Sequence, residues 1–369
     1  MMLLELATQL IQQPSVTPND CDCQKIIASL LKDNGFMIYQ NKINATDNLL
    51  AIKGPEDKPL ILFLGHTDVV PPGPGWKFDP FAAIIDDDNL HGRGAVDMKA
   101  AVAAMTIAAI ESNNNNYRIG ILLTSDEEGN GNDGIAKVIE LWQPILGDIA
   151  CCLVGEPTSE IQLGDTIKLG RRGSINACLR INGIQGHAAY PELASNPINM
   201  TSALIDKLST QVWDSEPTGD FPQTTLVITG INSGQQTCNI IPAYTDMFFN
   251  IRYSPICQPE ALKIQLTELL EELNLNYSWL SWQPNNGGPY KSKAGALTEK
   301  LISEIQNQLQ ITPKIKYNGG TSDGRFISKY CREVVEFGAK NNLAHKVDEH
   351  IAILDLEILK LIYQNCLKL

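Results

Sequence analysis

The amino-acid sequence predicts an α/β protein in which helices flank a mostly parallel sheet and a two-layer α+β (βαββαβ) domain is inserted. Three observations support this prediction. Apolar runs alternate with helical periodicity in the first half of the chain, which is typical of parallel strands joined by helices. The middle of the chain has a different order of elements. Candidate site residues lie on both sides of that middle block.

Four apolar runs in the first half predict strands, and the segments between them predict helices. The strands are expected at 48–53, 59–64, 118–124 and 149–154. The helices are expected at 21–34, 97–111 and 133–142, after an amphipathic N-terminal helix that ends before Pro14. Helices that connect parallel strands cover both faces of the sheet, so these strands should be buried.

The segment from 174 to 281 has the order strand, helix, strand, strand, helix, strand, which is typical of a two-layer sandwich. Its helices are expected at 196–209 and 259–273, and its later strands at 224–231, 245–253 and 277–281. Helix and strand patterns then resume at 296–308, 314–317, 325–331, 334–337 and 351–367. We therefore expect a catalytic domain in two parts, 1–173 and 289–369, with an inserted domain at 174–288 and a cleft between the domains.

Composition excludes several classes of protein. A chain of 369 residues exceeds the usual size of one core, and 43% hydrophobic with 19% charged residues is ordinary for a globular protein. No apolar stretch approaches the roughly 20 residues of a membrane span, and a net charge of −13 disfavours nucleic acid as a partner. The scattered cysteines and the absence of a cationic leader lead us to expect a cytoplasmic protein.

Acids and histidines follow several of the apolar runs, each beside a glycine or proline turn. They are His66, Asp68, Asp97, Glu127, Glu128, Glu156 and His345. Taken alone, Asp97 or His345 could simply cap a helix. Strands that end in such residues can converge, however, and clustered carboxylates and imidazoles are tolerated when a cation neutralises them. We therefore predict a metal-centred active site.

The spacing of these residues indicates how they could share the chemistry. His66 and Asp68 are two apart in an extended segment, so they point the same way and Asp68 can orient the imidazole. Glu127 and Glu128 are adjacent and point in different directions, so one can bind metal while the other serves as a base. This set of nitrogen and oxygen donors suits zinc best, with cobalt or manganese as substitutes.

Two other motifs offer alternatives. The run from Gly129 to Gly134 matches the dinucleotide pattern GxGxxG, but it follows three acids that would repel a pyrophosphate. The run from Gly320 to Gly324 matches the nucleophile elbow of a serine hydrolase, with Ser322 as the nucleophile. That alternative leaves the acids and histidines at the strand ends without a role.

The chain resembles the M20 dinuclear zinc amidohydrolases over nearly its whole length. The resemblance rests first on the segments 66–73, 92–99, 125–129 and 155–158, which contain the predicted ligands. Further similar segments are 170–174, 186–191, 238–242, 319–326 and 345–349. The resemblance implies a zinc-peptidase-like catalytic domain and a homodimer built through the inserted domain.

The resemblance also implies a role for each candidate. Asp97 would bridge two divalent ions, with His66 and Glu156 completing one site and Glu128 and His345 the other. Both ions would be zinc, with cobalt as an alternative in the second site. Glu127 would be the general base and acid, Asp68 would orient His66, and a cis peptide bond would follow Asp97.

The implied substrate is N-succinyl-LL-2,6-diaminopimelate, hydrolysed at its amide in lysine and diaminopimelate biosynthesis. His187 of the partner subunit would stabilise the oxyanion, and Asn239 would reach the same site. The carboxylates would be bound by Arg171, Arg252, Thr321 and Asn341. Because the net charge is −13, local cations such as Lys168 and Arg172 must also contribute. An enzyme acting on acetylornithine, or a metallopeptidase, stays open as an alternative within the family.

Overall fold

The computed structural model describes residues 2–214, 220–234 and 237–369. The described chain forms two compact units. The first unit comprises the described residues up to Gly170, together with Lys291–Lys316 and Ser322–Leu369. The second unit comprises the described residues of Arg171–Tyr290, together with Tyr317–Thr321. All the predicted metal ligands belong to the first unit.

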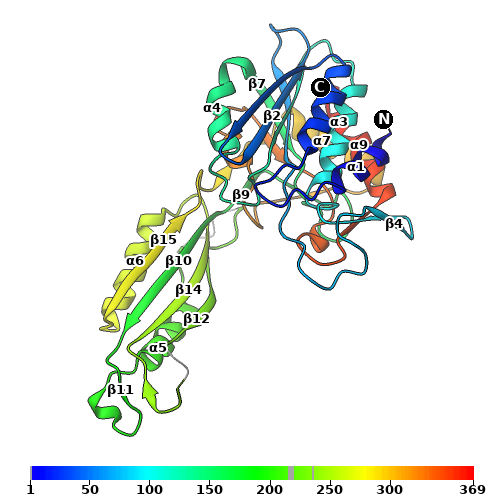
Figure 1. The fold of residues 1–369 in the computed structure, drawn as a ribbon. Coiled ribbons are helices and arrows are strands. Elements are labelled where there is room, and N and C mark those ends of the chain that lie inside the picture. The colour runs from blue at the N-terminus through cyan, green and yellow to red at the C-terminus, as the bar shows by residue number, and fades with distance from the viewer. Residues whose placement is uncertain (1, 215–219, 235–236) are drawn as a thin grey trace. The chain divides into compact units, whose positions relative to one another are not determined.

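Within the described residues, an eight-stranded sheet forms the centre of the first unit, in the order β1-β2-β6-β3-β7-β18-β8-β17 (Figure 1). The strands are β1 (Met37–Ile43), β2 (Thr46–Lys53), β3 (Leu60–His66), β6 (Arg118–Thr124), β7 (Ile149–Val154), β8 (Thr166–Lys168), β17 (Lys314–Lys316) and β18 (Val334–Glu336). β6, β3, β7 and β18 are neighbours and run parallel, whereas β1, β2 and β8 pair antiparallel with a neighbour. The predicted mostly parallel sheet is confirmed.

Helices pack on both sides of this sheet. They are α1 (Leu3–Ile11), α2 (Cys23–Asp33), α3 (Lys99–Glu111), α4 (Ile135–Leu146), α7 (Ala296–Leu309), α8 (Gly324–Ile327) and α9 (Ile353–Cys366). α1, α3, α7 and α9 gather on one side, and α4 lies on the other (Figure 1). α3 is buried at every position from Lys99 to Ala109, because its alanines let neighbours approach from all directions. With both faces covered, every residue of β3 and β6 is buried, as predicted.

A small sheet of three strands lies beside the main one in the first unit, counted over the described residues. It consists of β4 (Ile84–Asp86), β5 (Asn89–His91) and β19 (His350–Ala352), in the order β19-β5-β4. His350 pairs with His91 across β19 and β5. The chain that follows His345 is thereby tied to the chain that precedes Asp97. The sequence did not predict these short strands.

The second unit has the predicted βαββαβ order and two layers. Its elements are β10 (Gly173–Asn182), α5 (Pro197–Thr210), β12 (Thr225–Asn232), β14 (Tyr244–Tyr253), α6 (Pro259–Glu272) and β15 (Tyr277–Pro284). The antiparallel sheet has the order β12-β14-β10-β15, and both helices pack on one face through Leu204, Leu208, Leu262 and Leu266. A small pair, β11 (Gly186–His187) and β13 (Ile240–Ile241), and the 3-10 helix η1 (Pro191–Leu193) complete this unit.

Three further elements are short. The 3-10 helix η2 (Asn341–Leu343) lies in the first unit, just before His345. β9 (Gly170–Arg171) and β16 (Tyr290–Lys291) lie where the chain passes from one unit to the other. None of the described helices combines the length and the apolar character that a membrane span requires.

Candidate metal centre

The predicted ligands lie at the carboxyl ends of neighbouring strands. His66 ends β3, Glu127 and Glu128 follow β6, and Glu156 follows β7. β6, β3 and β7 are adjacent and parallel, so their carboxyl ends meet at one edge of the sheet. Asp97 lies two residues before α3, in a turn that contains the cis peptide bond Asp97–Met98, and the cis bond expected there is present.

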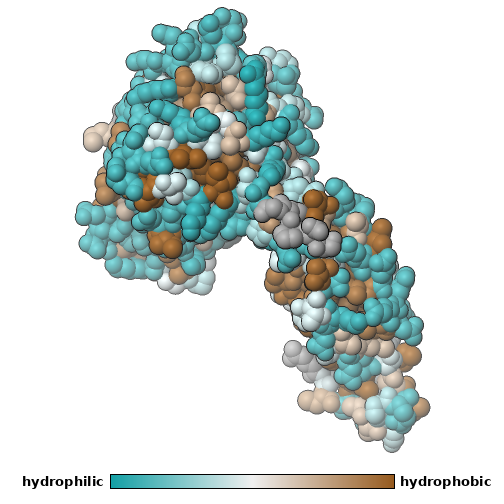
Figure 2. All heavy atoms as spheres, turned by 180° about the vertical axis from the view of Figure 1, so that it is seen from behind, coloured by the Kyte–Doolittle hydropathy of each residue, from teal (hydrophilic) through white to brown (hydrophobic). Residues whose placement is uncertain are grey.

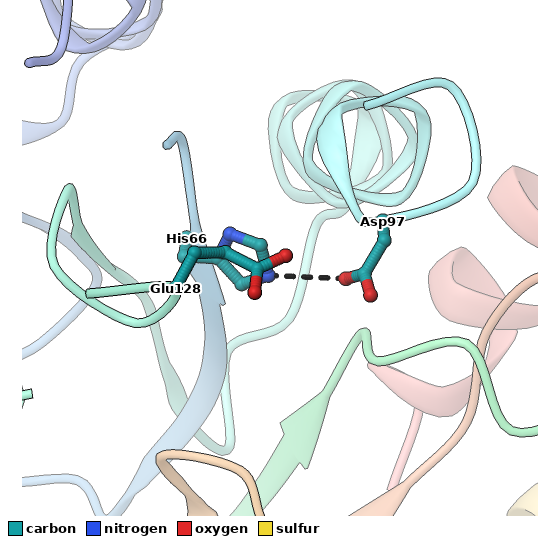
Figure 3. A group of neighbouring side chains, drawn as sticks. All are labelled: His66, Asp97 and Glu128. Carbon is teal, nitrogen blue, oxygen red and sulfur yellow. Dashed lines mark hydrogen bonds and ion pairs between the residues drawn. The ribbon is translucent and has the colours of Figure 1, made fainter. Parts of the chain in front are cut away.

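One half of the site forms around the imidazole of His66. Its Nε2 lies 3.1 Å from Oδ1 of Asp97 and 3.8 Å from Oε1 of Glu156. Figure 3 shows His66, Asp97 and Glu128 pointing toward one another, with the contact between His66 and Asp97 as a dashed line. Nδ1 of His66 is 2.9 Å from the main-chain oxygen of Asp68, which leaves Nε2 to face the carboxylates.

The other half of the site forms around His345. Its Nε2 lies 2.8 Å from Oε1 of Glu128 and 3.4 Å from Oδ2 of Asp97. His345 has a positive φ of 63°, and half of its side chain is exposed. Asp97 therefore presents one carboxylate oxygen to each histidine.

The donors in this site fit two divalent ions. Each half offers one imidazole nitrogen and one carboxylate of its own, and the halves share the carboxylate of Asp97. Without cations, these donors would be three carboxylates and two imidazoles in largely buried surroundings, which is unfavourable. Neutral histidine and carboxylate ligands match the preferences of zinc.

Two acids, Asp68 and Glu127, lie next to the proposed ligands. The carboxylate of Asp68 is fully buried and accepts the main-chain N–H groups of Glu127 and Glu128, at 3.4 and 3.1 Å. Its Oδ1 also lies 3.6 Å from Nδ1 of His66. The main-chain oxygen of Asp68 is closer to the same nitrogen, at 2.9 Å. Asp68 thus connects the histidine to the turn that carries both glutamates. Single donor atoms of His66, Glu127 and Glu156 lie within 4.8 Å of one another.

Burial and mutual charge shift the pKa values in this cluster. Burial, followed by the charge of Glu156, holds the pKa of Glu127 well above its ordinary value. Hydrogen bonds with Asp97 and Glu128 raise the pKa of His345 to about 10. Burial opposes protonation of His66, but the hydrogen bond with Asp97 and the charges of Asp68 and Asp97 outweigh it, so the pKa of His66 is also raised. Without metal, the cluster therefore retains protons that bound ions would displace.

Comparison with known proteins identifies the family of this chain. The model of the family "Peptidase family M20/M25/M40" matches residues 62–369. The chain belongs to the M20/M25/M40 peptidase family. A succinyl-diaminopimelate desuccinylase from Thiobacillus denitrificans is 42% identical over 371 residues, covering 99% of this chain and 94% of that protein. One from Nitrosospira multiformis is 43% identical over 368 residues, covering 98% and 96%.

Solved structures share the M20 fold. An M20 family metallo-carboxypeptidase from Sulfolobus solfataricus aligns with a TM-score of 0.84 at 18% identity, covering 100% of this chain and 99% of that one. A dinuclear metal binding peptidase from Bacillus subtilis aligns with a TM-score of 0.71 at 16% identity, covering 99% and 96%. At these identities the similarity concerns the fold.

The raised pKa values of His345 and Asp68 predict how the stability of the metal-free protein depends on pH. His345 has an ordinary pKa of 6.5 and a folded pKa of about 10. Its protonated form is favoured by folding, so that stabilisation is complete below about pH 6.5 and is lost as the pH rises towards 10. Burial raises the pKa of Asp68 to about 6, which also lowers stability as the pH rises, over a more acidic interval.

We expect the melting temperature of chelator-treated protein to fall from pH 6.5 to pH 10, measured by thermal unfolding in matched buffers. The fall should be smaller in a His345→Asn variant, which lacks the titrating group. It should also be smaller in zinc-loaded protein, because ligand histidines must be neutral. A melting temperature that rises over this interval in the metal-free protein would contradict the raised pKa of His345.

The other residues implied by the M20 resemblance are mostly in the second unit. His187 lies on β11, and the main-chain oxygen of Asn239 accepts a hydrogen bond from Ala188, so these two candidates share one region. Nη1 of Arg171 donates to the oxygen of Gly320, next to Thr321. Asn341 lies in the first unit, where it begins η2 four residues before His345.

Three arginines of the second unit gather near one another. Burial lowers the pKa of Arg252, and the charge of Arg171 lowers it further. Burial and the charge of Arg252 lower the pKa of Arg172 in the same way. Positive charges that repel one another are stabilised by a nearby anion, and Asp214 already acts on Arg172 in this way. This cationic cluster stands out in a chain with a net charge of −13.

The two alternative motifs have structural roles. The hydroxyl of Ser322 is fully buried and donates a hydrogen bond to the buried carboxylate of Glu336, so it is not presented to a substrate. In the glycine-rich run, the N–H groups of Asn132 and Asp133 both donate to Asp126 at 2.9 Å. These N–H groups are therefore not available to a phosphate.

The structure also brings one residue to the site that the sequence had not assigned. Nη1 of Arg325 lies 4.0 Å from Oε1 of Glu127, and Nη2 lies 3.7 Å from Asp323. Arg325 directly follows the run from Gly320 to Gly324, which matches the motif of a serine nucleophile. The arginine that follows the motif, and not the serine within it, therefore faces the predicted base.

Proposed function

We propose that this M20 protein hydrolyses the amide of N-succinyl-LL-2,6-diaminopimelate to succinate and LL-2,6-diaminopimelate, and so serves lysine and diaminopimelate biosynthesis. The observation that carries this proposal is the 40–43% identity, over nearly the full length, to proteins named succinyl-diaminopimelate desuccinylase. The intact set of ligands and the neighbouring acid Glu127 support a catalytic rather than a purely binding role.

We assign the ligands of the two ions as two sets that share Asp97. His66 and Glu156 complete one set, and Glu128 and His345 complete the other, in agreement with the contacts around the two imidazoles. We propose zinc in both sites, with cobalt as an alternative in the second. Bound divalent ions of this kind lower the pKa of water and polarise a carbonyl.

Glu127 is the proposed general base and acid. Its carboxylate lies within 4.8 Å of donor atoms of His66 and Glu156, but it is not needed to complete either set of ligands. Burial and the neighbouring Glu156 raise its pKa, so it readily takes up a proton. Glu127 would accept the proton of the attacking water and pass it to the amine that leaves.

The substrate carries three carboxylates, for which we propose cationic and polar partners. The carboxylates would be bound by Arg171, Arg252, Thr321 and Asn341, and the oxyanion by His187 of the partner subunit with Asn239 nearby. The repulsion among Arg171, Arg172 and Arg252 would be relieved by an anionic ligand. An uncharged or smaller acyl group would bring no carboxylate to these arginines.

The substrate proposal is tested by comparing kcat/KM for N-succinyl-LL-2,6-diaminopimelate, acetylornithine and an unblocked dipeptide. We expect the succinyl substrate to exceed the others by at least about 10-fold, because each lost hydrogen bond to a charged group costs roughly 1.5–3 kcal/mol. Equal or faster turnover of acetylornithine would refute the substrate, while metal-dependent hydrolysis of any of the three would keep the reaction class.

We also propose a homodimer built through the inserted domain. Val227 and Phe248 are exposed, although their neighbours Ile228 and Phe249 pack toward the helices, so both lie on the face of the sheet that α5 and α6 do not cover. Apolar residues reach the surface of each unit in the view of Figure 2. Sedimentation equilibrium should give twice the chain mass of 40.5 kDa, and a monomer at micromolar concentration would exclude this assembly.

A cytoplasmic location is the last part of the proposal. All nine cysteines are free thiols, which suits a reducing compartment. Cell fractionation should recover the activity with cytoplasmic markers, and recovery with periplasmic or membrane markers would refute the proposed location.

A further inference from the structure

A buried ion pair lies beside the metal centre but includes none of the proposed ligands. Nη1 of Arg93 donates to Oε2 of Glu349 at 2.7 Å. The side chains are 1% and 0% exposed, so both charges are removed from water. A buried pair of this kind is stable only when hydrogen bonds satisfy the remaining donors and acceptors.

Glu349 accepts hydrogen bonds from the turn that carries Asp97. Oε1 accepts the N–H groups of Val96 and Asp97, at 2.7 and 3.1 Å. Oε2 accepts the N–H of Gly94 at 3.0 Å, in addition to Arg93. One carboxylate therefore holds three main-chain groups of this turn, including that of the bridging residue itself.

Arg93 connects this turn to two other ligand-bearing segments. Nη1 donates to the main-chain oxygen of Lys346 at 3.1 Å, directly after the ligand His345. Nη2 donates to the oxygen of Pro72 at 3.2 Å, in the segment that follows His66. The guanidinium also lies 5.0 Å from the ring centroid of Trp76. Three segments that are distant in sequence thus meet at one side chain.

The arrangement couples Asp97 to His345. Glu349 lies four residues after His345 and contacts the N–H of Asp97, and its main-chain oxygen accepts the N–H of Gly92 at 2.9 Å. Two members of the second proposed set of ligands, Asp97 and His345, come from these two segments, and the third, Glu128, follows β6. A shift of Glu349 would therefore change the separation of the two ligand atoms, 3.4 Å between Oδ2 of Asp97 and Nε2 of His345.

We propose that Arg93 and Glu349 are positioning residues that set the affinity of the centre for its divalent ions, by fixing the turn of Asp97 against the segment of His345. Groups that orient metal ligands commonly change metal affinity 10–100-fold when they are replaced. This inference rests on the metal centre proposed above.

The test compares zinc binding by the full-length protein and by a Glu349→Gln variant. Glutamine has the same shape, but its amide nitrogen would face N–H donors that now bind a carboxylate oxygen. We expect the dissociation constant for zinc, measured by competition with a chromophoric chelator, to rise about 10–100-fold. The visible spectrum of the cobalt-loaded variant should change as well, because it reports the geometry of the ligands.

Glu333→Gln is the matched control. Glu333 is also a buried carboxylate, 6% exposed, that accepts several N–H groups, but its partners Gly295, Leu297 and Thr298 lie at the start of α7. This control should lower the melting temperature without changing zinc affinity or the cobalt spectrum. The measurements are made at a temperature at which all variants are folded by circular dichroism.

Arg93→Lys provides a second variant in case Glu349→Gln does not fold. Lysine keeps the charge but cannot reach Glu349 and the oxygens of Lys346 and Pro72 together. It should weaken zinc binding by at least about 10-fold. Unchanged zinc affinity in the folded Arg93 and Glu349 variants, with a wild-type protein that binds two ions, would overturn this inference alone. A wild-type protein that binds no divalent ion would overturn the metal centre together with it.

Discussion

Replacing Glu127 by glutamine is expected to lower kcat by at least about 100-fold while the content of bound metal stays unchanged. Glu127 lies beside His66 and Glu156, but the two proposed sets of ligands are complete without it. The amide keeps the size of the side chain and cannot take up the proton of a water molecule. Steady-state hydrolysis and elemental analysis of the same preparation measure the two quantities.

Glu140→Gln is the control for this substitution. Glu140 is an exposed glutamate on α4, so its replacement should change neither kcat nor metal content. A Glu127→Gln enzyme with full activity would exclude Glu127 as the base. Loss of metal together with activity would instead assign Glu127 to the ligands.

The replacement of Asp97 by asparagine should lower turnover more than the replacement of Glu127 by glutamine. Asp97 faces both histidines, with Oδ1 3.1 Å from His66 and Oδ2 3.4 Å from His345. Asparagine removes the negative charge and one of the two acceptor oxygens. We expect fewer than two ions per chain and a loss of turnover of about 1000-fold or more, because a bound ion contributes several kcal/mol to catalysis and about 1.4 kcal/mol corresponds to a factor of ten.

Asp86→Asn is the control for Asp97. Asp86 is a half-exposed aspartate whose carboxylate pairs with Lys77 at 2.8 Å. Its replacement should leave the number of bound ions and the turnover as they are. Two tightly bound ions and normal turnover in the Asp97→Asn protein would show that no bridging carboxylate is needed.

The part of the site at the strand ends could be predicted from the sequence because it depends on local patterns. Continuous apolar runs predicted β3, β6 and β7, and His66, Glu127, Glu128 and Glu156 lie at the ends of these strands or in the turns that follow them. Parallel neighbours necessarily bring their carboxyl ends together. The order of strands and helices in the middle of the chain is also a local pattern, and it predicted the two-layer unit.

Other parts depend on contacts that no local pattern encodes. β1 was not predicted, because its position at the edge of the sheet leaves it without a continuous apolar run. The short strands β4, β5 and β19 form through pairing with one another. Arg93 and Glu349 are 256 residues apart, so their ion pair becomes visible only in the folded chain. Ser322 matched a catalytic motif, but its burial against Glu336 could not be predicted from that motif.

Anomalous X-ray diffraction from crystals grown with zinc tests the metal centre most directly. We predict two peaks about 3.5–4 Å apart. One should be bounded by His66, Asp97 and Glu156, and the other by Asp97, Glu128 and His345, with the carboxylate of Asp97 between them. A map without zinc at these side chains, or with the side chains turned away from one another, would contradict the proposed dinuclear site.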